Sequence, residues 1–214
     1  MVEAIIFDMD GVISDTQKLH AQVEADLLSR FGVLITPEEV SRRFAGVRTK
    51  DFFGELLAAQ DQIYDLDELM KEKWILMEKL ASQVEAINGS IELIKHLHAR
   101  KVPLAVASAS NAAYVKKVLA ELEISEMFTA IVSGDMVSKG KPDPESFLRA
   151  ASELHVDPEH CLVVEDGRSG MEGARRAGMY CIALVNNIEE DYPTPNRVRS
   201  LLEISDEYLL NVSK

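Results

Sequence analysis

Short apolar runs recur along the chain, and amphipathic stretches separate most of them. Five runs are nearly continuous in apolar residues and therefore predict strands buried on both faces of a parallel sheet: 4–7, 103–107, 130–133, 161–164 and 180–185. Helical periodicity lies between the last four, over 112–122, 145–154 and 169–177. Gly178 fits a helix stop, and Pro144 after Asp143 fits a first helical residue. This alternation predicts an α/β fold with a doubly wound parallel sheet.

The interval between the first two strands is much longer than a strand crossover requires. It covers residues 8–102, roughly 95 residues, whereas a crossover needs about a dozen or more. Helical patterns fill it, over 16–31, 50–60, 66–82 and 90–100, with a capping box at 36–39. We therefore expect a helical insertion over 16–82 and a core made of 1–15 and 83–214. A loop over 191–195 and a short terminal helix complete the prediction.

Charge and composition narrow the classes of function. Lys and Arg number 23 against 36 Asp and Glu, which gives a net charge of −13. This balance argues against nucleic acid and anionic membrane as partners, but a few local cations or a metal could hold a small phosphorylated metabolite. No apolar run approaches the ~20 residues of a membrane span, and we find no secretion leader. Only Cys161 and Cys181 are present, so we expect reduced thiols in a cytoplasmic, monomeric protein.

Polar residues with catalytic chemistry follow four of the predicted elements. Ligands bind outside the carboxyl ends of the strands of an open parallel sheet, so these residues are expected to meet at one edge. They are Asp8 and Asp10 after the first strand, Ser108 after the second, Lys141 after the third, and Glu165 and Asp166 at the end of the fourth. Each has an ordinary interpretation by itself, because such residues are commonly solvated turns or helix caps. Because all of these residues are expected at the same edge of the sheet, we favour an active site there.

The residue types suit phosphoryl transfer through a covalent aspartyl phosphate. A carboxylate nucleophile, Asp8, divides the reaction into two displacements. A phosphate dianion repels that carboxylate, and the hard oxygen ligands of Asp8, Glu165 and Asp166 would hold the Mg²⁺ that separates the two charges. A turn at Gly11 would move Asp10 outward, to protonate the leaving oxygen and later deprotonate water. Ser108 and Lys141 would neutralise and orient the other phosphoryl oxygens.

The chain resembles the haloacid dehalogenase superfamily along essentially its whole length. Four segments carry the resemblance: Phe7-Asp8-Met9-Asp10-Gly11-Val12 with Asp15-Thr16, Val106-Ala107-Ser108, Gly140-Lys141-Pro142-Asp143-Pro144, and Val164-Glu165-Asp166-Gly167. The resemblance implies a Rossmann-like core with a mobile helical cap at 16–82. It also implies these roles: Asp8 as nucleophile, Asp10 as acid/base with its backbone carbonyl on the metal, Ser108, Ala109 and Lys141 as phosphate ligands, and Glu165 and Asp166 as Mg²⁺ ligands. Dehalogenating members lack Asp10, which favours phosphoryl chemistry.

Within the superfamily, the chain is similar to phosphatases and β-phosphoglucomutases that carry a helical cap. Thr16 and His20 follow the mutase-like pattern, and His20 would couple cap closure to the acid/base. The loop 44–50, with Gly46 and Arg48, lies where the subgroup places its specificity loop, and Arg48 could bind a second anionic group or begin a helix in solvent. Mutases place an arginine three residues after the loop glycine, where this chain has Thr49. Trp74 is expected in the core of the cap.

The favoured function is a Mg²⁺-dependent phosphatase of a small phosphorylated metabolite such as a sugar phosphate. A sugar phosphomutase of the β-phosphoglucomutase type is the alternative enzyme, because both reactions use the same phosphoenzyme. A phosphoacceptor signalling module is disfavoured, since receiver domains carry their aspartate after a middle strand and lack a helical cap. A catalytically inactive homologue is disfavoured because no motif residue is missing.

Overall fold

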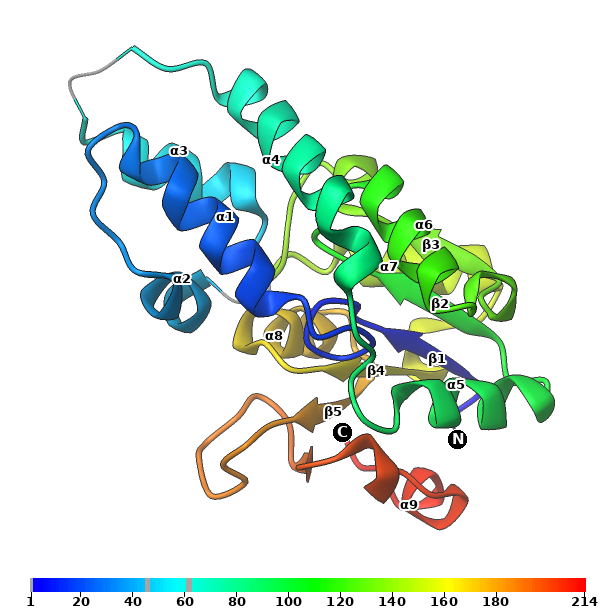
Figure 1. Ribbon diagram of the computed structural model, residues 1–214. Coiled ribbons are helices and arrows are strands. Elements are labelled where there is room, and N and C mark those ends of the chain that lie inside the picture. Colours follow the sequence, from blue (N-terminus) through cyan, green and yellow to red (C-terminus); the bar gives the residue numbers. More distant parts are fainter. Residues whose placement is uncertain (1, 45–46, 61–62) are drawn as a thin grey trace.

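The computed structural model describes residues 2–44, 47–60 and 63–214. Six parallel strands form one sheet in the order β3-β2-β1-β4-β5-β6 (Figure 1). Their bounds are β1 Ala4–Phe7, β2 Leu104–Ala107, β3 Ala130–Val132, β4 Cys161–Glu165, β5 Tyr180–Leu184 and β6 Asn196–Val198. The order reverses between β1 and β4, and such a switch point is where open α/β sheets bind ligands. The predicted doubly wound α/β fold is confirmed, and its architecture is Rossmann-like.

Helices cover both faces of the sheet, which explains why its four central strands, β2, β1, β4 and β5, are almost entirely apolar. Side chains of a strand alternate between faces, so Ile5 and Phe7 pack on one side and Ala4 and Ile6 on the other. The first side is covered by α5 and α6 and the second by α7 and α8. Their bounds are α5 Ser90–Ala99, α6 Ala112–Glu121, α7 Glu145–Leu154 and α8 Arg168–Arg176. The chain ends with α9, Asp206–Leu210, below β6 in Figure 1.

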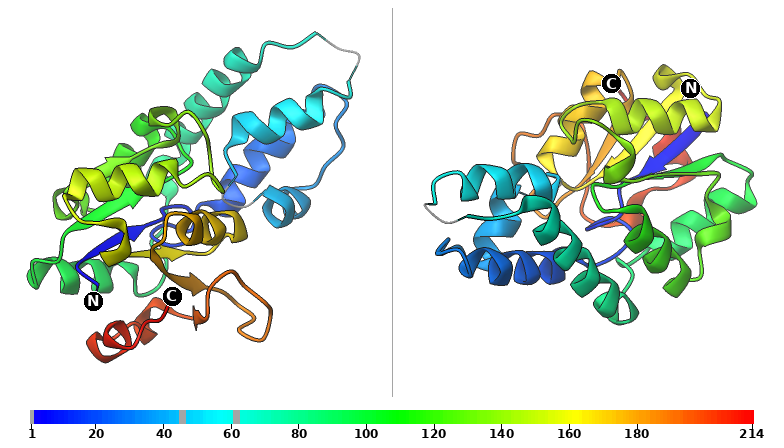
Figure 2. Two further views of the ribbon diagram at one scale, coloured as in Figure 1. Left: turned by 180° about the vertical axis from the view of Figure 1, so that it is seen from behind. Right: turned by 90° about the horizontal axis from the view of Figure 1, so that it is seen from above.

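Four helices between β1 and α5 gather at one end of the molecule, beyond the carboxyl ends of the strands (Figure 2). They are α1 Gln17–Ser29, α2 Pro37–Phe44, α3 Thr49–Leu57 and α4 Leu66–Leu80. The predicted capping box opens α2, because Glu39 N donates to Thr36 Oγ1 and Thr36 N donates to the Glu39 carboxylate. Asp65 caps α4 by accepting from Asp67 N and Glu68 N. We refer to α1–α4 below as the helical insertion.

Most predicted elements lie within a few residues of their observed positions, and three details differ. The prediction missed β6, which spans only three residues and pairs with β5 at the edge of the sheet. Pro144 is the residue before α7 and not its first helical residue. Five short 3₁₀ turns were also not predicted: Ala81–Gln83, Ser125–Met127, Gly134–Met136, Pro158–His160 and Leu201–Glu203. Segments this short carry too little periodicity to be recognised from sequence.

Both thiols are buried and unpaired, as expected. Burial, followed by the nearby carboxylates of Asp157 and Glu3, raises the pKa of Cys161 to about 11. A thiol with so high a pKa is a poor nucleophile, which fits a structural role. No helix of the described residues combines the length and apolar character needed to cross a bilayer.

Candidate active site

The register of the sheet brings the ends of three strands to one level. Phe7 of β1 pairs with Val106 of β2 and with Val164 of β4. The next residues therefore leave the sheet side by side, and Asp8 N donates to Val164 O at 3.0 Å. Asp8, Ser108 and Glu165 follow within one or two residues of these pairs. Asp8, Ser108 and Glu165 therefore lie at one edge of the sheet.

A buried lysine lies between two buried carboxylates at this edge. Lys141 Nζ is 2.5 Å from Asp8 Oδ1 and 2.9 Å from Glu165 Oε1, and all three side chains are at most 6 % exposed. Burial raises the pKa of Asp8 to about 7, because the opposing attraction of Lys141 is partly cancelled by Glu165 and Asp10. Burial by itself would lower the pKa of Lys141, but its attraction to the carboxylates of Asp8 and Glu165 is stronger, so the pKa of Lys141 is raised overall. Lys141 therefore stays charged, beside a surplus of negative charge.

The surplus carboxylates fit a divalent cation. Asp8, Glu165 and Asp166 each offer an oxygen atom, and these atoms lie within 4.8 Å of one another. Burial, then Glu165 and Asp8, raise the pKa of Asp166 well above its ordinary value. Such repulsion is what a bound cation would relieve, and oxygen atoms are the ligands that Mg²⁺ prefers. The donor set therefore fits Mg²⁺.

Two glycines leave room for the carboxylates of this cluster. A Cβ on Gly170 would lie 1.8 Å from Glu165 Oε1, and one on Gly11 would lie 2.2 Å from Asp166 Oδ2. Gly11 also has φ +97°, in the left-handed region that favours glycine. Glu165 is held further by Gly167 N, which donates to Oε2 at 2.7 Å. The amide of Gln17, at the start of α1, donates to the Asp166 carboxylate.

Asp10 is turned away from this cluster, into a set of hydrogen-bond donors. The Thr16 hydroxyl donates to Oδ1, and the hydroxyls of Ser110 and Ser108 donate to Oδ2 at 2.8 and 3.3 Å. His20 Nε2 lies 3.2 Å from Oδ1. Burial opposes ionisation of Asp10, but His20, Thr16 and Ser110 outweigh it and hold its pKa well below the ordinary value. The pKa values of Asp8 and Asp10 are thus shifted in opposite directions, so without a bound cation Asp8 holds a proton more readily than Asp10 does.

One cavity joins this edge of the sheet to the helical insertion. Asp8, Asp10, Ala109 and Ser110 line its base. The rest of the lining comes from α1–α4 and the residues beside them: Gln17, His20, Ala21, Glu24, Val40, Ser41, Phe44, Val47, Thr49, Phe52, Lys73 and Trp74. The His20 ring meets Trp74 and Tyr114 edge to face, with centroids 5.9 and 5.4 Å away. A ligand in this cavity would contact both the sheet edge and the insertion.

The predicted residues of the insertion divide into three groups. Thr16 and His20 contact Asp10, as described above. Gly46 lies outside the described residues. Arg48 is not among the residues that line the cavity: it bonds to Asp51 and donates to the carbonyls of Val137 and Ser138, in the loop before α7. The structure therefore places Arg48 at a contact between the insertion and the core.

Several residues of the site were not predicted from the sequence. Ser110 is one of them: its hydroxyl donates to Asp10, while the next residue, Asn111, caps α6. Trp74 packs against the apolar core of the insertion, as expected, and also forms part of the cavity wall. Glu24 and Lys73 gave no motif signal, although a charged residue on the apolar face of a predicted helix was an available cue.

Fold and site together define an α/β enzyme of Rossmann-like architecture with an acidic cluster at the carboxyl edge of its sheet. Residues 5–184 match the sequence profile of the family described as haloacid dehalogenase-like hydrolase. The chain belongs to this family, in the subgroup of phosphoglucomutase- and phosphatase-like members, as the motifs predicted.

Individual relatives match the chain over nearly its whole length. It is 30% identical to a phosphorylated carbohydrates phosphatase of Thermotoga maritima, over 100% of this chain and 99% of the relative. It is 31% identical to the fructose-1-phosphate phosphatase YqaB of Escherichia coli, over 82% of this chain and 92% of the relative. A crystal structure of β-phosphoglucomutase from Clostridium difficile superposes with a TM-score of 0.87, at 26% identity, covering 98% of this chain and 96% of that one.

Proposed function

We propose that the protein is a Mg²⁺-dependent phosphatase that hydrolyses a small phosphorylated carbohydrate through an aspartyl phosphate on Asp8. One observation supports this most: Asp8 and Asp10 line the base of the same cavity, Asp8 in a carboxylate cluster that fits a cation and Asp10 beside His20. A nucleophile and an acid/base on one ligand-sized space are what phosphomonoester hydrolysis requires. The names of the relatives from Thermotoga maritima and Escherichia coli support the substrate class.

In this proposal Asp8 forms a bond to phosphorus while the bond from phosphorus to the substrate oxygen breaks. Asp10 is ionised in the free protein, so in this proposal it takes up a proton as the substrate binds and passes that proton to the leaving oxygen; His20 Nε2 lies 3.2 Å from the Asp10 carboxylate. The alcohol departs, and Asp10 then takes a proton from water, whose oxygen attacks phosphorus and frees Asp8. Inorganic phosphate is the second product.

The remaining groups bind and orient the phosphoryl oxygens. Lys141 and Ser108 would hold them, with Ala109 beside them in the cavity lining. Mg²⁺ on Asp8, Glu165 and Asp166, and on the backbone carbonyl of Asp10, would screen the phosphate from the Asp8 carboxylate. Because the phosphate end is recognised by groups common to all phosphomonoesters, the insertion must recognise the rest of the substrate.

We further propose that the chain forms two parts, a catalytic core and a cap. Residues 1–15 and 83–214 would form the catalytic core, and 16–82 would form a cap that closes over it. The cavity supports this division, since its base belongs to the first part and most of its wall to the second. Closure of such a cap would exclude bulk water and commit the substrate.

A β-phosphoglucomutase-type activity is the second candidate. The likeness to the β-phosphoglucomutase structure and the placement of Thr16 and His20 on Asp10 favour it. Position 49 argues against it: Thr49 is buried beside Glu24, and Arg48 points to the core loop instead of the cavity. A mutase must bind a second phosphate, and a threonine supplies no charge for that purpose.

A phosphate-release screen over phosphorylated sugars, with Mg²⁺ and in parallel with an isomerisation assay on β-glucose 1-phosphate, tests the two candidates. We expect phosphate release without isomerisation. EDTA should abolish turnover, and Ca²⁺ should support it poorly because its coordination is longer and looser.

The nucleophile is tested by Asp8→Asn, which keeps the shape of the side chain and removes its charge. We expect turnover to fall by several orders of magnitude with folding intact. Asp26→Asn, on the exposed face of α1, is the matched control and should behave as the wild type. Retention of more than a few per cent of activity by Asp8→Asn would refute the assignment.

A further inference from the structure

Inside the helical insertion, three polar side chains that the proposed mechanism does not use form a buried cluster. Lys73 Nζ is 2.7 Å from Glu24 Oε1, and the side chains are 1 % and 7 % exposed. Thr49 Oγ1 donates to the same Glu24 oxygen at 2.8 Å and accepts from Lys73. The cluster joins α1, α3 and α4 and lines the cavity above Asp10. Charged groups are rarely buried without a partner, and here each charge has one.

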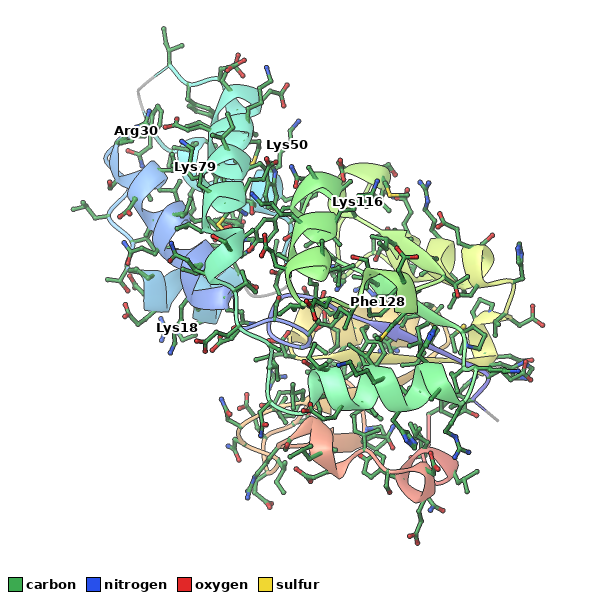
Figure 3. The ribbon with its side chains drawn as sticks, turned by 45° about the vertical axis from the view of Figure 1, so that its right-hand side comes forward. Lys18, Arg30, Lys50, Lys79, Lys116 and Phe128 are labelled. Atoms are coloured by element: carbon green, nitrogen blue, oxygen red, sulfur yellow. The ribbon has the colours of Figure 1, made fainter. Side chains whose placement is uncertain are left out.

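Within the cluster the charges of Lys73 and Glu24 cancel, and His20 Nδ1 lies 4.0 Å from the same Glu24 oxygen. Of the described residues that line the cavity, Lys73 is the single lysine or arginine, and Glu24 neutralises it. Three further lysines of the insertion, Lys18, Lys50 and Lys79, are labelled in Figure 3 and are exposed, and Arg48 contacts the core loop. The neighbouring walls are apolar or aromatic and include Phe52 and Trp74. A second phosphate would thus have to enter a low-dielectric space whose lysine is already neutralised.

The same cluster is well suited to hydroxyl groups. The Glu24 carboxylate has oxygen lone pairs that can accept from an alcohol, while Lys73, which has three N–H donors, can donate to the alcohol oxygen. An uncharged polyol can form hydrogen bonds with both Glu24 and Lys73 while the ion pair between them stays intact. An anion that drew Lys73 away would instead leave the Glu24 carboxylate buried and uncompensated.

We infer that Glu24 and Lys73 form a neutral hydroxyl-binding subsite that selects monophosphates of uncharged polyhydroxy compounds and rejects substrates with a second phosphate. This inference rests on the proposed function for the site of phosphate cleavage and adds the chemistry of the leaving group. Glu24 is the deciding residue, because its charge determines whether Lys73 is available to an anion. Removing that charge converts a neutral subsite into a cationic one.

The comparison of fructose 1-phosphate with fructose 1,6-bisphosphate tests the inference, since the two ligands differ in one phosphate. We expect the wild type to prefer the monophosphate in kcat/KM by about 10-fold or more. Glu24→Gln, which keeps the shape of the side chain, should shift the ratio at least ~10-fold toward the bisphosphate. The double variant Glu24→Gln/Lys73→Met is neutral again and should restore the original preference. Glu72→Gln, in the exposed pair with Arg30, is the matched control and should leave the ratio unchanged.

Binding can be measured separately from catalysis, because Trp74 is the single tryptophan of the chain and lies in the cavity wall. Lys73 Nζ is 4.2 Å from the centre of the indole ring, so displacement of Lys73 should alter the fluorescence of Trp74. Titrations of the two sugar phosphates in an Asp8→Asn background, with Mg²⁺, give the ratio of dissociation constants without turnover. The same shift is expected for Glu24→Gln, and the same reversal in the double variant.

The outcomes separate the two claims. An unchanged ratio in Glu24→Gln, or equal binding of both ligands by the wild type, overturns the subsite. A shift that persists in the double variant also overturns it, because charge would then not be the cause. If no phosphomonoester is hydrolysed with Mg²⁺ while the binding ratio still shifts and reverses, the proposed phosphatase activity fails and the subsite stands.

Discussion

Replacement of Lys141 by methionine isolates the contribution of the buried lysine to the site. The side chain is 1 % exposed and touches the carboxylates of Asp8 and Glu165 at 2.5 and 2.9 Å. Methionine keeps much of its length and apolar packing, including the side of the Phe147 ring over which the ammonium lies. What it removes is the positive charge between two buried negative ones. The metal-free variant should therefore be strongly destabilised.

The size of the effect follows from the geometry. Removal of one partner from a buried ion pair costs about 3–5 kcal/mol, because the other charge is left uncompensated. For a chain of this length each kcal/mol lowers Tm by about 2–4 °C, so a loss of roughly 6–20 °C is expected at pH 8 without metal. Lower pH should reduce the loss. Without Lys141 the pKa of Asp8 rises beyond its value of about 7, and protonation removes the repulsion.

Thermal unfolding of wild type, Lys141→Met and Lys139→Met from pH 5.5 to pH 8.5, with EDTA, measures this. Lys139 lies in the same loop but is 74 % exposed and reaches only Asp143, at 3.9 Å, so its variant gives the effect of an exposed lysine. Saturating Mg²⁺ should recover part of the Tm lost by Lys141→Met, since the cation would neutralise the same carboxylates. Equal Tm losses for the two variants at pH 8, or a loss independent of pH, would refute the reasoning.

Two further predictions follow. In the metal-free wild type, the pKa values of Asp8 and Asp166 are raised, so the folded state binds more protons than the unfolded state. The contribution of these two groups to stability is therefore greatest below pH 4 and falls as the pH rises toward about 7. A Tm in EDTA that does not decline over this pH range, relative to the Tm of the Mg²⁺-bound protein, would contradict the prediction. Arg48→Ala should lower kcat/KM for a sugar phosphate and for p-nitrophenyl phosphate by the same factor, about 3- to 10-fold, because Arg48 contacts the core loop and not the cavity. A loss of kcat/KM confined to the sugar phosphate would instead show that Arg48 contacts the leaving group.

Much of the core was predictable because its signals are local and its geometry is regular. A buried parallel strand must be apolar, so β1 appears in the sequence as the run that ends before Asp8. Parallel strands share the level of their carboxyl ends, which is why residues as distant as Asp8, Ser108 and Glu165 could be expected at one edge. The insertion was recognisable from its length and helical periodicity. The short edge strand β6 carried no comparable pattern and was missed.

The sequence by itself thus determined the fold class and the candidate site residues at the sheet edge, while the tertiary structure decided which side chains face the cavity. Position 48 and position 49 are adjacent at the start of α3, yet Thr49 is buried against Glu24 and Arg48 turns to the core loop. Glu24 and Lys73 are 49 positions apart on two helices, and only the packing of those helices makes them an ion pair. Helical periodicity assigns a residue to a face but not to a partner, because the rotation and depth of each helix are set by side chains throughout the interface.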